Sequence, residues 1–251
     1  MDGELCRAPV SPAEVPRLDP DAWEVRRRRA VRLAANHRAV GAEQPPTSTV
    51  LLDIGGVVIP TLFESVAVPG FPGGPFAGEG SYRDVEQGRL PEREYWNRVA
   101  QRHPQLDIGM LWRACSQVRG EIRTLIVQLG GRVRLAAFTN DMSHWFGEQW
   151  QGRFVELRAF DVILEASRLG VHKPEPEAFH AAARALAEPA ARILFVDDLA
   201  ANLDGAESVG MQTMLFDVLD PAGSVRRLLA RVGSPAEAHG PAAARVFRVT
   251  R

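Results

Sequence analysis

The stretch that most constrains the fold runs from Ser48 to Val58 and reads S-T-V-L-L-D-I-G-G-V-V. A run of β-branched and aliphatic residues leads to Asp53, and Gly55 and Gly56 break it directly afterwards. This pattern predicts a buried strand that ends on a tight turn. Because ligands of open α/β sheets bind at the carboxyl ends of the strands, Asp53 is the first candidate site residue.

Further polar residues follow apolar runs of the same kind, or open a helical stretch. They are Thr139 and Asn140 at the end of residues 133–140, Asp197 and Asp198 at the end of residues 192–198, and Lys173, which precedes Pro174. Residues so far apart along the chain meet only if a parallel sheet brings the ends of their strands to one edge.

Strand and helix patterns alternate along the rest of the second half of the chain. Strands are expected at residues 161–166 and 212–217, an edge strand at 246–249, and helices at 175–187, 200–209 and 224–232. Helices of this length between strands predict right-handed crossovers. The expected fold class is α/β, a three-layer Rossmann-like parallel sheet with an inserted helical cap.

The insertion lies between the first and second strands. Residues 60–80 are dense in Pro and Gly and are expected to form an irregular loop, and helical patterns follow at 82–87, 91–102, 109–118 and 121–129. We therefore expect three parts: an N-terminal extension (1–46), an α/β core (47–62 and 130–251) and a helical cap with the Pro/Gly-rich loop (63–129).

A basic helix is expected in the N-terminal extension, from about residue 22 to 40. Its apolar residues fall near one face: Trp23, Ala30, Leu33, Ala34 and His37. We expect this face to pack on the core or on a second subunit, so a homodimer is one expectation. The alternative is a basic element that reaches towards an anionic substrate or partner.

The motifs, taken in order, resemble those of the haloacid dehalogenase-like (HAD-like) hydrolases over residues 47–217. In that family a nucleophilic Asp follows the first strand, a Thr or Ser follows the second, a Lys precedes a helix, and an acidic pair follows the fourth strand. Similarity to the phosphatase-like members with a D-x-G-G-V first motif implies hydrolysis of a small phosphorylated molecule, such as a sugar phosphate.

The resemblance implies a nucleophile and a metal site. Asp53 would form a covalent aspartyl-phosphate, with Gly55 and Gly56 leaving room for the substrate to approach. The implied cofactor is magnesium, bound through oxygen ligands. These ligands would be Asp53, the backbone carbonyl of Gly55, Asp197 and Asp198.

The resemblance also implies a phosphate site. Thr139 and Asn140 would hold phosphate oxygens, and Lys173 would pair with the phosphate and with Asp53. Lys173 is the only lysine in the chain, against 29 arginines. The chain otherwise uses arginine for positive charge but has an ammonium at this position. This indicates that the position requires a compact point charge, which a planar guanidinium would not replace.

One position departs from the family pattern, because typical phosphatases carry a second Asp where this chain has Gly55. That Asp is the general acid, worth on the order of 10² to 10⁴ in rate. Three explanations are open. The substrate has a good leaving group; or Asp141, His144 or His172 substitutes; or the protein is slow or inactive and acts by binding.

Three functions follow from these readings. The first is a magnesium-dependent phosphohydrolase, the second is a non-catalytic binder of a phosphorylated ligand, and the third is a dehalogenase-like hydrolase of a carbon–halogen bond. The acidic pair Asp197 and Asp198 favours phosphoryl chemistry over halide displacement, because the family's dehalogenases use no metal.

Composition adds bounds on the partners and the compartment. The 251 residues carry 30 basic and 31 acidic side chains, so nothing global suggests nucleic acid or membrane as a partner. Cys6 and Cys115 are distant in sequence, so reduced cysteines and a cytoplasmic location are expected. The N-terminus has acidic residues and no long apolar run, so neither a signal peptide nor a membrane span is expected.

Overall fold

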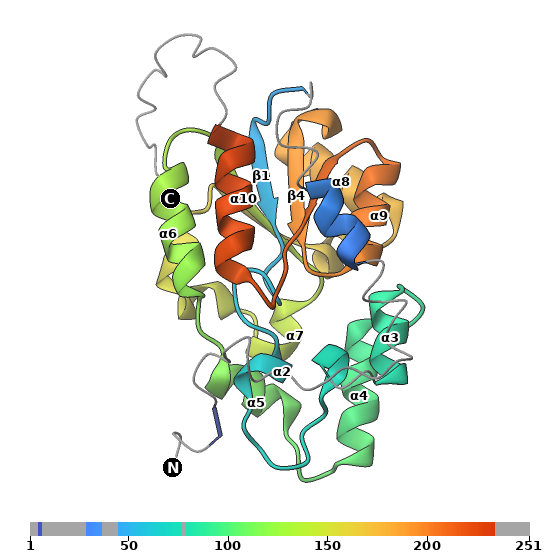
Figure 1. Cartoon of the computed structure of the whole chain (residues 1–251). Helices are drawn as coiled ribbons and strands as arrows, with labels where there is room; N and C mark the ends of the chain where they lie inside the picture. Colours follow the sequence, from blue (N-terminus) through green and yellow to red (C-terminus); the bar gives the residue numbers. More distant parts are fainter. Residues whose placement is uncertain (1–4, 7–28, 37–44, 77–78, 234–251) are drawn as a thin grey trace.

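The computed structural model describes residues 5–6, 29–36, 45–76 and 79–233, and its core is a five-stranded parallel sheet (Figure 1). The strand order is β3-β2-β1-β4-β5. The strands are β1 (Thr49–Leu52), β2 (Arg134–Thr139), β3 (Val162–Glu165), β4 (Ile193–Asp197) and β5 (Gln212–Leu215). The predicted parallel α/β architecture is confirmed, whereas the edge strand expected at 246–249 lies outside the described residues.

Helices cover both faces of the sheet (Figure 1). One face carries α8 (Pro176–Leu186) and α9 (Ala200–Ser208), and the other carries α6 (Gly120–Leu129) and α10 (Pro221–Gly233), which lie side by side. Successive residues of the central strand β1 point to opposite faces of the sheet. Because helices cover both faces, β1 is buried on both sides. Leu51 packs in the cluster with α8 and α9, while Val50 and Leu52 pack in the other.

The strand register brings the predicted site residues to one edge of the sheet. Leu52, the last residue of β1, is paired with β2 on one side and with β4 on the other. Asp53 follows Leu52, Thr139 ends β2 and Asp197 ends β4. The chain order reverses at β1, and the carboxyl end of such a reversal is where open α/β sheets bind ligands.

Four helices gather beyond the carboxyl ends of the strands (Figure 1). They are α2 (Leu62–Ser65), α3 (Gly80–Glu86), α4 (Glu92–Arg102) and α5 (Ile108–Cys115). Aromatic rings form their common core, where the Phe63 ring lies 4.7 Å from Tyr82 and 5.0 Å from Trp96. The division of the chain into core and cap at residues 63–129 stays a prediction, and α6, within that range, packs beside α10.

The irregular loop predicted for residues 60–80 is wrong at residues 62–65, which form α2. The backbone N–H and the hydroxyl of Thr61 both donate to the Glu64 carboxylate, at 2.8 and 2.9 Å, so the start of the helix is capped. Other short helices are α7 (Met142–Phe146), η3 (Gly74–Phe76), η4 (Trp150–Arg153), η5 (Val155–Ala159), η6 (Ala166–Leu169) and η7 (Ala190–Arg192).

The described part of the N-terminal helix, residues 29–36, docks on the edge of the sheet. The Asn36 side-chain amide donates to the backbone carbonyl of Leu215 at 2.9 Å and accepts from its N–H at 3.2 Å. Ala30 and Ala34 are exposed, so the predicted apolar face is wrong at these positions, and Trp23 and His37 lie outside the described residues.

The arginines of this helix pair with acidic residues of the core. Arg29 pairs with Asp217, and Arg32 pairs with Asp204 and Glu207. The alternative that the helix reaches out to an anionic partner is therefore not favoured for Arg29 and Arg32. The expected homodimer stays a prediction.

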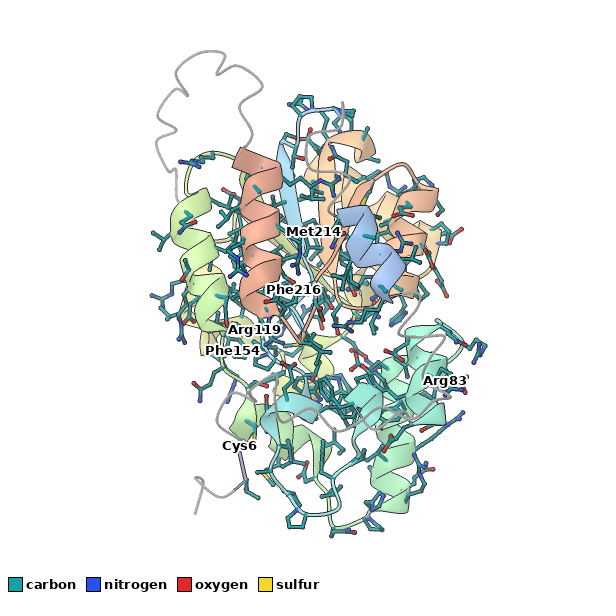
Figure 2. The ribbon with its side chains drawn as sticks, in the orientation of Figure 1. Cys6, Arg83, Arg119, Phe154, Met214 and Phe216 are labelled. Atoms are coloured by element: carbon teal, nitrogen blue, oxygen red, sulfur yellow. A yellow bond between two sulfur atoms is a disulfide. The ribbon has the colours of Figure 1, made fainter. Side chains whose placement is uncertain are left out.

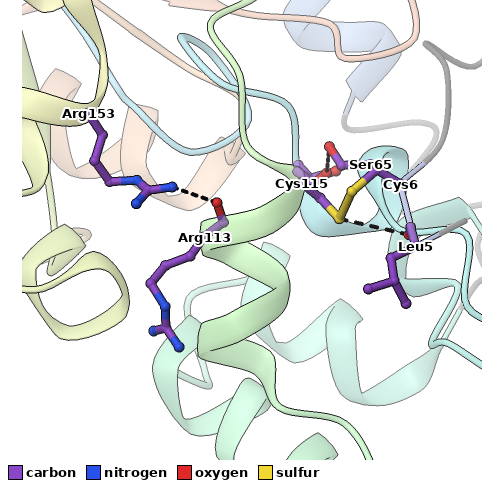
Figure 3. Close-up of a disulfide and its surroundings, with 7 residues drawn as sticks. Leu5, Cys6, Ser65, Arg113, Cys115 and Arg153 are labelled. Atoms are coloured by element: carbon purple, nitrogen blue, oxygen red, sulfur yellow. Dashed lines mark hydrogen bonds between the residues drawn. A yellow bond between two sulfur atoms is a disulfide. The ribbon is translucent and has the colours of Figure 1, made fainter. Parts of the chain in front are cut away.

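A disulfide joins Cys6 to Cys115 at the end of α5, so the expectation of reduced cysteines is corrected (Figure 3). Their Cα atoms are 5.3 Å apart although 109 residues separate them in sequence. Residue 6 reaches α5 because it pairs with Val66 just after α2. Disulfides are uncommon in the cytosol, so this bond does not favour the predicted cytoplasmic location.

Among the described helices, none has the length and apolar character needed to cross a membrane.

Gly205 of α9 packs directly on the loop that carries Lys173, and we expect alanine there to destabilise the protein. A Cβ would lie 2.1 Å from the Pro174 carbonyl oxygen and 2.7 Å from the Phe179 ring. Alanine in place of a helical glycine ordinarily stabilises by about 0.5–1 kcal/mol. Overpacking should reverse the sign in Gly205→Ala and cost about 1–3 kcal/mol, measured by urea denaturation.

The matched control is Gly120→Ala at the start of α6, where a Cβ would meet no atom within 4 Å. Equal stability of Gly205→Ala and the wild type would contradict the close packing of α9 on this loop.

Candidate active site

Asp53 leaves the central strand at the edge of the sheet and is only 8% exposed. Its backbone N–H donates to the carbonyl of Val196 at 2.9 Å, which continues the β1–β4 pairing to this residue. Gly56, in the turn that follows, has a φ of +81°, and a Cβ there would lie 2.4 Å from the Asp198 carboxylate carbon. Glycine at position 56 thus lets Asp198 approach the turn that carries Asp53.

Lys173 is buried between two carboxylates. Its Nζ lies 2.8 Å from Asp53 Oδ1 and 2.8 Å from Asp197 Oδ2. The rings of Phe138 and Phe195 flank the ammonium at 5.6 and 5.3 Å. Burial opposes its charge, but Asp197 and Asp53 raise the pKa of Lys173 above its ordinary value, so the lysine stays protonated.

Asp197 is fully buried and serves as the anchor of Lys173. Its Oδ2 also accepts from Asn202 Nδ2 at 2.9 Å, and its Oδ1 accepts from the Leu199 N–H at 2.8 Å. Both oxygens are therefore engaged by protein donors. Sequence reasoning missed Asn202, although an Asn one helical turn after an acidic pair is a readable signal.

Three carboxylates meet at this edge: one oxygen each of Asp53, Asp197 and Asp198 lies within 4.8 Å of the other two. Burial raises the pKa of Asp53 to about 7, Lys173 opposes this shift and Asp197 adds to it. Burial and the charges of Asp197 and Asp53 also raise the pKa of Asp198 well above its ordinary value. These shifts show how unfavourable three negative charges are here beside one ammonium.

This set of donors fits a hard divalent cation, because carboxylate oxygens are the ligands that Mg²⁺ prefers. Asp53 and Asp198 are the freer ligands, since Asp197 already accepts hydrogen bonds on both oxygens. A role for the Gly55 carbonyl in metal binding stays a prediction.

Thr139 and Asn140 differ in what they offer to a ligand. The Thr139 side chain is buried at the cavity, and none of the described residues makes a hydrogen bond to its hydroxyl. The Asn140 side chain donates to the Lys173 carbonyl at 3.2 Å and accepts from the Lys173 N–H at 2.8 Å. In this structure the Asn140 amide positions Lys173, and its predicted contact with phosphate stays a prediction.

A cavity of about 510 Å³ lies between this edge of the sheet and helices α3, α4 and α5. Seven of the eight predicted site residues line it: Asp53, Gly55, Gly56, Thr139, Asn140, Lys173 and Asp198. Asp197, the eighth, has no exposed surface and contacts the cavity residues through its ion pair with Lys173. The structure therefore brings the predicted residues together in one place.

The proposed substitutes for the missing acid lie in different places. Asp141 and His172 line the cavity, whereas His144 does not. Asp141 is already paired with Arg93 of α4, which links this helix to the loop after β2.

Arg119, which sequence reasoning missed, fixes the turn after the nucleophile. Its backbone N–H donates to Val58, and its Nη2 donates to the Gly56 carbonyl at 2.9 Å and to Glu64 Oε2 at 2.8 Å. The guanidinium lies 5.5 Å from the centre of the Phe216 ring, and Figure 2 shows the two side chains beside each other. No motif marks Arg119, because it lies 63 residues beyond Gly56 in the chain.

A sequence model of the family described as haloacid dehalogenase-like hydrolase matches residues 47–210. Drimenol cyclase drtB of Aspergillus calidoustus is 28% identical over 164 residues, covering 61% of this chain and 30% of that protein. Phosphatase MT3486 of Mycobacterium tuberculosis is 35% identical over 85 residues, covering 32% of this chain and 38% of that protein. The chain thus spans less than two fifths of the length of these curated relatives.

Solved structures with the same fold include the L-2-haloacid dehalogenase RSc1362, which is 19% identical with a TM-score of 0.50. The match covers 76% of this chain and 100% of that one. The HAD family enzyme bt-2542 of Bacteroides thetaiotaomicron, solved with magnesium and inorganic phosphate, is 20% identical with a TM-score of 0.45 over 68% of this chain and 95% of that one.

The geometry around Lys173 predicts that arginine cannot replace it. A planar guanidinium cannot keep both 2.8 Å contacts between the Phe138 and Phe195 rings, so Asp53 would be displaced. We expect Lys173→Arg to lose about 10²-fold or more in kcat, measured as phosphate release from acetyl phosphate and p-nitrophenyl phosphate. The exposed exchange Arg184→Lys is the control, and wild-type rates in Lys173→Arg would refute the point-charge argument.

Proposed function

This chain belongs to the haloacid dehalogenase-like hydrolases, and from that premise we propose that it is a magnesium-dependent phosphohydrolase of a small phosphorylated metabolite. The observation that carries the proposal is the contact of 2.8 Å between Lys173 and Asp53, in a cluster with two further carboxylates. Phosphoryl transfer needs a positioned nucleophile and fixed charges around the phosphoryl group, and this cluster offers both.

The carboxylate cluster favours phosphoryl transfer over dehalogenation. A set of three carboxylates that suits a divalent cation has no evident use in displacing halide from carbon. The likeness to the L-2-haloacid dehalogenase concerns the fold alone at 19% identity. The 35% identity with a curated phosphatase, although limited to 85 residues, supports the same preference.

Of the predicted ligands, Asp53, Asp198 and the backbone carbonyl of Gly55 would hold Mg²⁺ from the cavity, whereas Asp197 would have to give up a hydrogen bond to bind it. When bound, the cation supplies positive charge beside the phosphoryl oxygens. Lys173, itself held by Asp197, would keep Asp53 in place.

The chain's own residues then account for the steps at phosphorus. The Asp53 carboxylate attacks the phosphorus atom and forms an aspartyl-phosphate as the bond to the leaving oxygen breaks. Lys173 favours the ionised form of Asp53, and the Thr139 hydroxyl, which lines the same cavity, would donate to a phosphoryl oxygen. Residues of helices α3 to α5 form the wall of the cavity that faces this cluster.

A second candidate function is a non-catalytic binder of a phosphorylated ligand. The absence of a carboxyl at Gly55 favours it, because the usual general acid is missing there. The same charge cluster would hold the ligand without turnover.

Phosphate release is expected to require magnesium and Asp53. We would assay sugar phosphates, nucleotides, acyl phosphates and diphosphates with and without Mg²⁺, beside Asp53→Asn. Turnover of at least one class should vanish on chelation, and kcat should fall by at least about 10³-fold in the variant, because the nucleophile is lost.

The control variant is Asp84→Asn, whose carboxylate pairs with Arg89 at the surface of α3. Magnesium-independent turnover, or turnover that survives Asp53→Asn, would refute the proposal. Phosphate or magnesium binding without any turnover would establish the binder instead.

A further inference from the structure

Gly55 leaves open space beside the nucleophile. A Cβ at this position would meet no atom within 4 Å, and Gly55 lines the cavity. A phosphohydrolase must still protonate the leaving oxygen and later deprotonate water, so a carboxyl on another wall of the cavity is the group to look for.

Glu92 provides such a carboxyl from the opposite side, in the first turn of α4. It lines the same cavity as Asp53 and Lys173. Its Oε1 accepts a hydrogen bond from Trp96 Nε1 at 3.2 Å, and Trp96 is fixed by stacking on the Phe63 ring at 5.0 Å. Within the described part of the chain no residue donates to Oε2, which leaves that oxygen for the cavity.

The surroundings of Glu92 suit proton transfer near neutral pH. Burial raises its pKa to about 7; the hydrogen bond from Trp96 and the charge of Lys173 oppose the shift, and Asp141 and Asp197 add to it. Glu92 also interacts electrostatically with Tyr82 of α3, Tyr95 of α4 and Asp198 after β4. A carboxyl with this pKa exists in both protonation states at working pH.

The other candidates on the cavity wall are less suited, because Glu94 is paired with Arg98 and Glu175 is exposed. Asp141 is held in an ion pair with Arg93. His172 and His144 are exposed, and His144 does not line the cavity. Glu92 alone among these groups is fixed by a buried neighbour and free on one oxygen.

We propose that Glu92 is the general acid and base of this site, in place of the carboxyl absent at Gly55, an inference that rests on the phosphohydrolase function proposed above. In the first step the Glu92 carboxyl gives its proton to the leaving oxygen as the phosphorus–oxygen bond breaks and the Asp53–phosphorus bond forms. In the second step the Glu92 carboxylate takes a proton from water, whose oxygen attacks phosphorus. The bond to Asp53 breaks, and phosphate, free Asp53 and protonated Glu92 result.

The test compares leaving groups in Glu92→Gln. The substrates are 2,4-dinitrophenyl phosphate, which needs no acid, and phenyl and alkyl phosphates, which do. We expect kcat/KM to fall by about 10²-fold or more on phenyl and alkyl phosphates and by only a few fold on the dinitrophenyl ester. On the dinitrophenyl ester, Asp53 should also accumulate as the phosphoenzyme, seen by intact mass, because the base for the second step is missing.

The pH profile gives a second readout. The acid must be protonated in the first step, so the wild-type kcat/KM on phenyl phosphate should decline as pH rises through the Glu92 pKa, about 7. This decline should be absent in Glu92→Gln. Glu92→Asp keeps a carboxyl on a shorter arm and should retain the decline at a reduced rate.

The matched control is Glu86→Gln. Glu86 of the neighbouring helix α3 is also a glutamate whose pKa burial raises to about 7, but it does not line the cavity. Leaving-group dependence and pH profile should be unchanged in Glu86→Gln. Circular dichroism of each variant checks folding.

A gain-of-function variant keeps the proposal falsifiable if Glu92→Gln is poorly folded. Gly55→Asp has room for its side chain, so Gly55→Asp with Glu92→Gln should recover activity on phenyl phosphate, while Gly55→Asn should not. If a folded Glu92→Gln loses kcat/KM equally on all leaving groups, or loses none, the role of Glu92 is overturned, while the phosphohydrolase function still stands. A wild type inactive on these esters and on every class of the panel described above would overturn the phosphohydrolase function and this inference with it.

Discussion

The ammonium of Lys173, buried between the carboxylates of Asp53 and Asp197, is the interaction on which the rest of the site depends. Removing a charge from water is costly unless it is paired and hydrogen-bonded. Three segments meet this requirement: Asp53 directly after β1 and Asp197 at the end of β4 supply the carboxylates, and Asn140 after β2 holds the lysine backbone. The site therefore depends on β1 lying between β2 and β4.

A second set of contacts ties the inserted helices to the nucleophile. Arg119, just before α6, donates to the Gly56 carbonyl, and Glu64 of α2 accepts from the same guanidinium. Arg93 of α4 pairs with Asp141 after β2. Arg119 therefore joins α2 to the turn that follows Asp53, and Arg93 joins α4 to the loop after β2.

Much of the fold and the site followed from the sequence, for a physical reason. Buried parallel strands require continuous apolar runs, so a polar residue that directly follows such a run is expected at the carboxyl end of the strand. This reasoning located Asp53 and Thr139. The sequence could not reveal side-chain partners across the chain, such as Asn140 on Lys173 or Cys6 on Cys115. Nor could it distinguish Glu92 from the charged surface residues of the same amphipathic helix. The spacing of polar and apolar residues does not show which side of a helix lines a cavity.

The contact between Asn36 and Leu215 has a consequence for how this chain meets copies of itself. β5 is an edge strand, and such edges expose unpaired N–H and C=O groups that can recruit a strand from another molecule. The Asn36 amide mimics a peptide group and occupies both groups of Leu215. The helix at residues 29–36 thereby blocks the addition of a strand at Leu215. A strand from another molecule that pairs along β5 would first have to displace this helix.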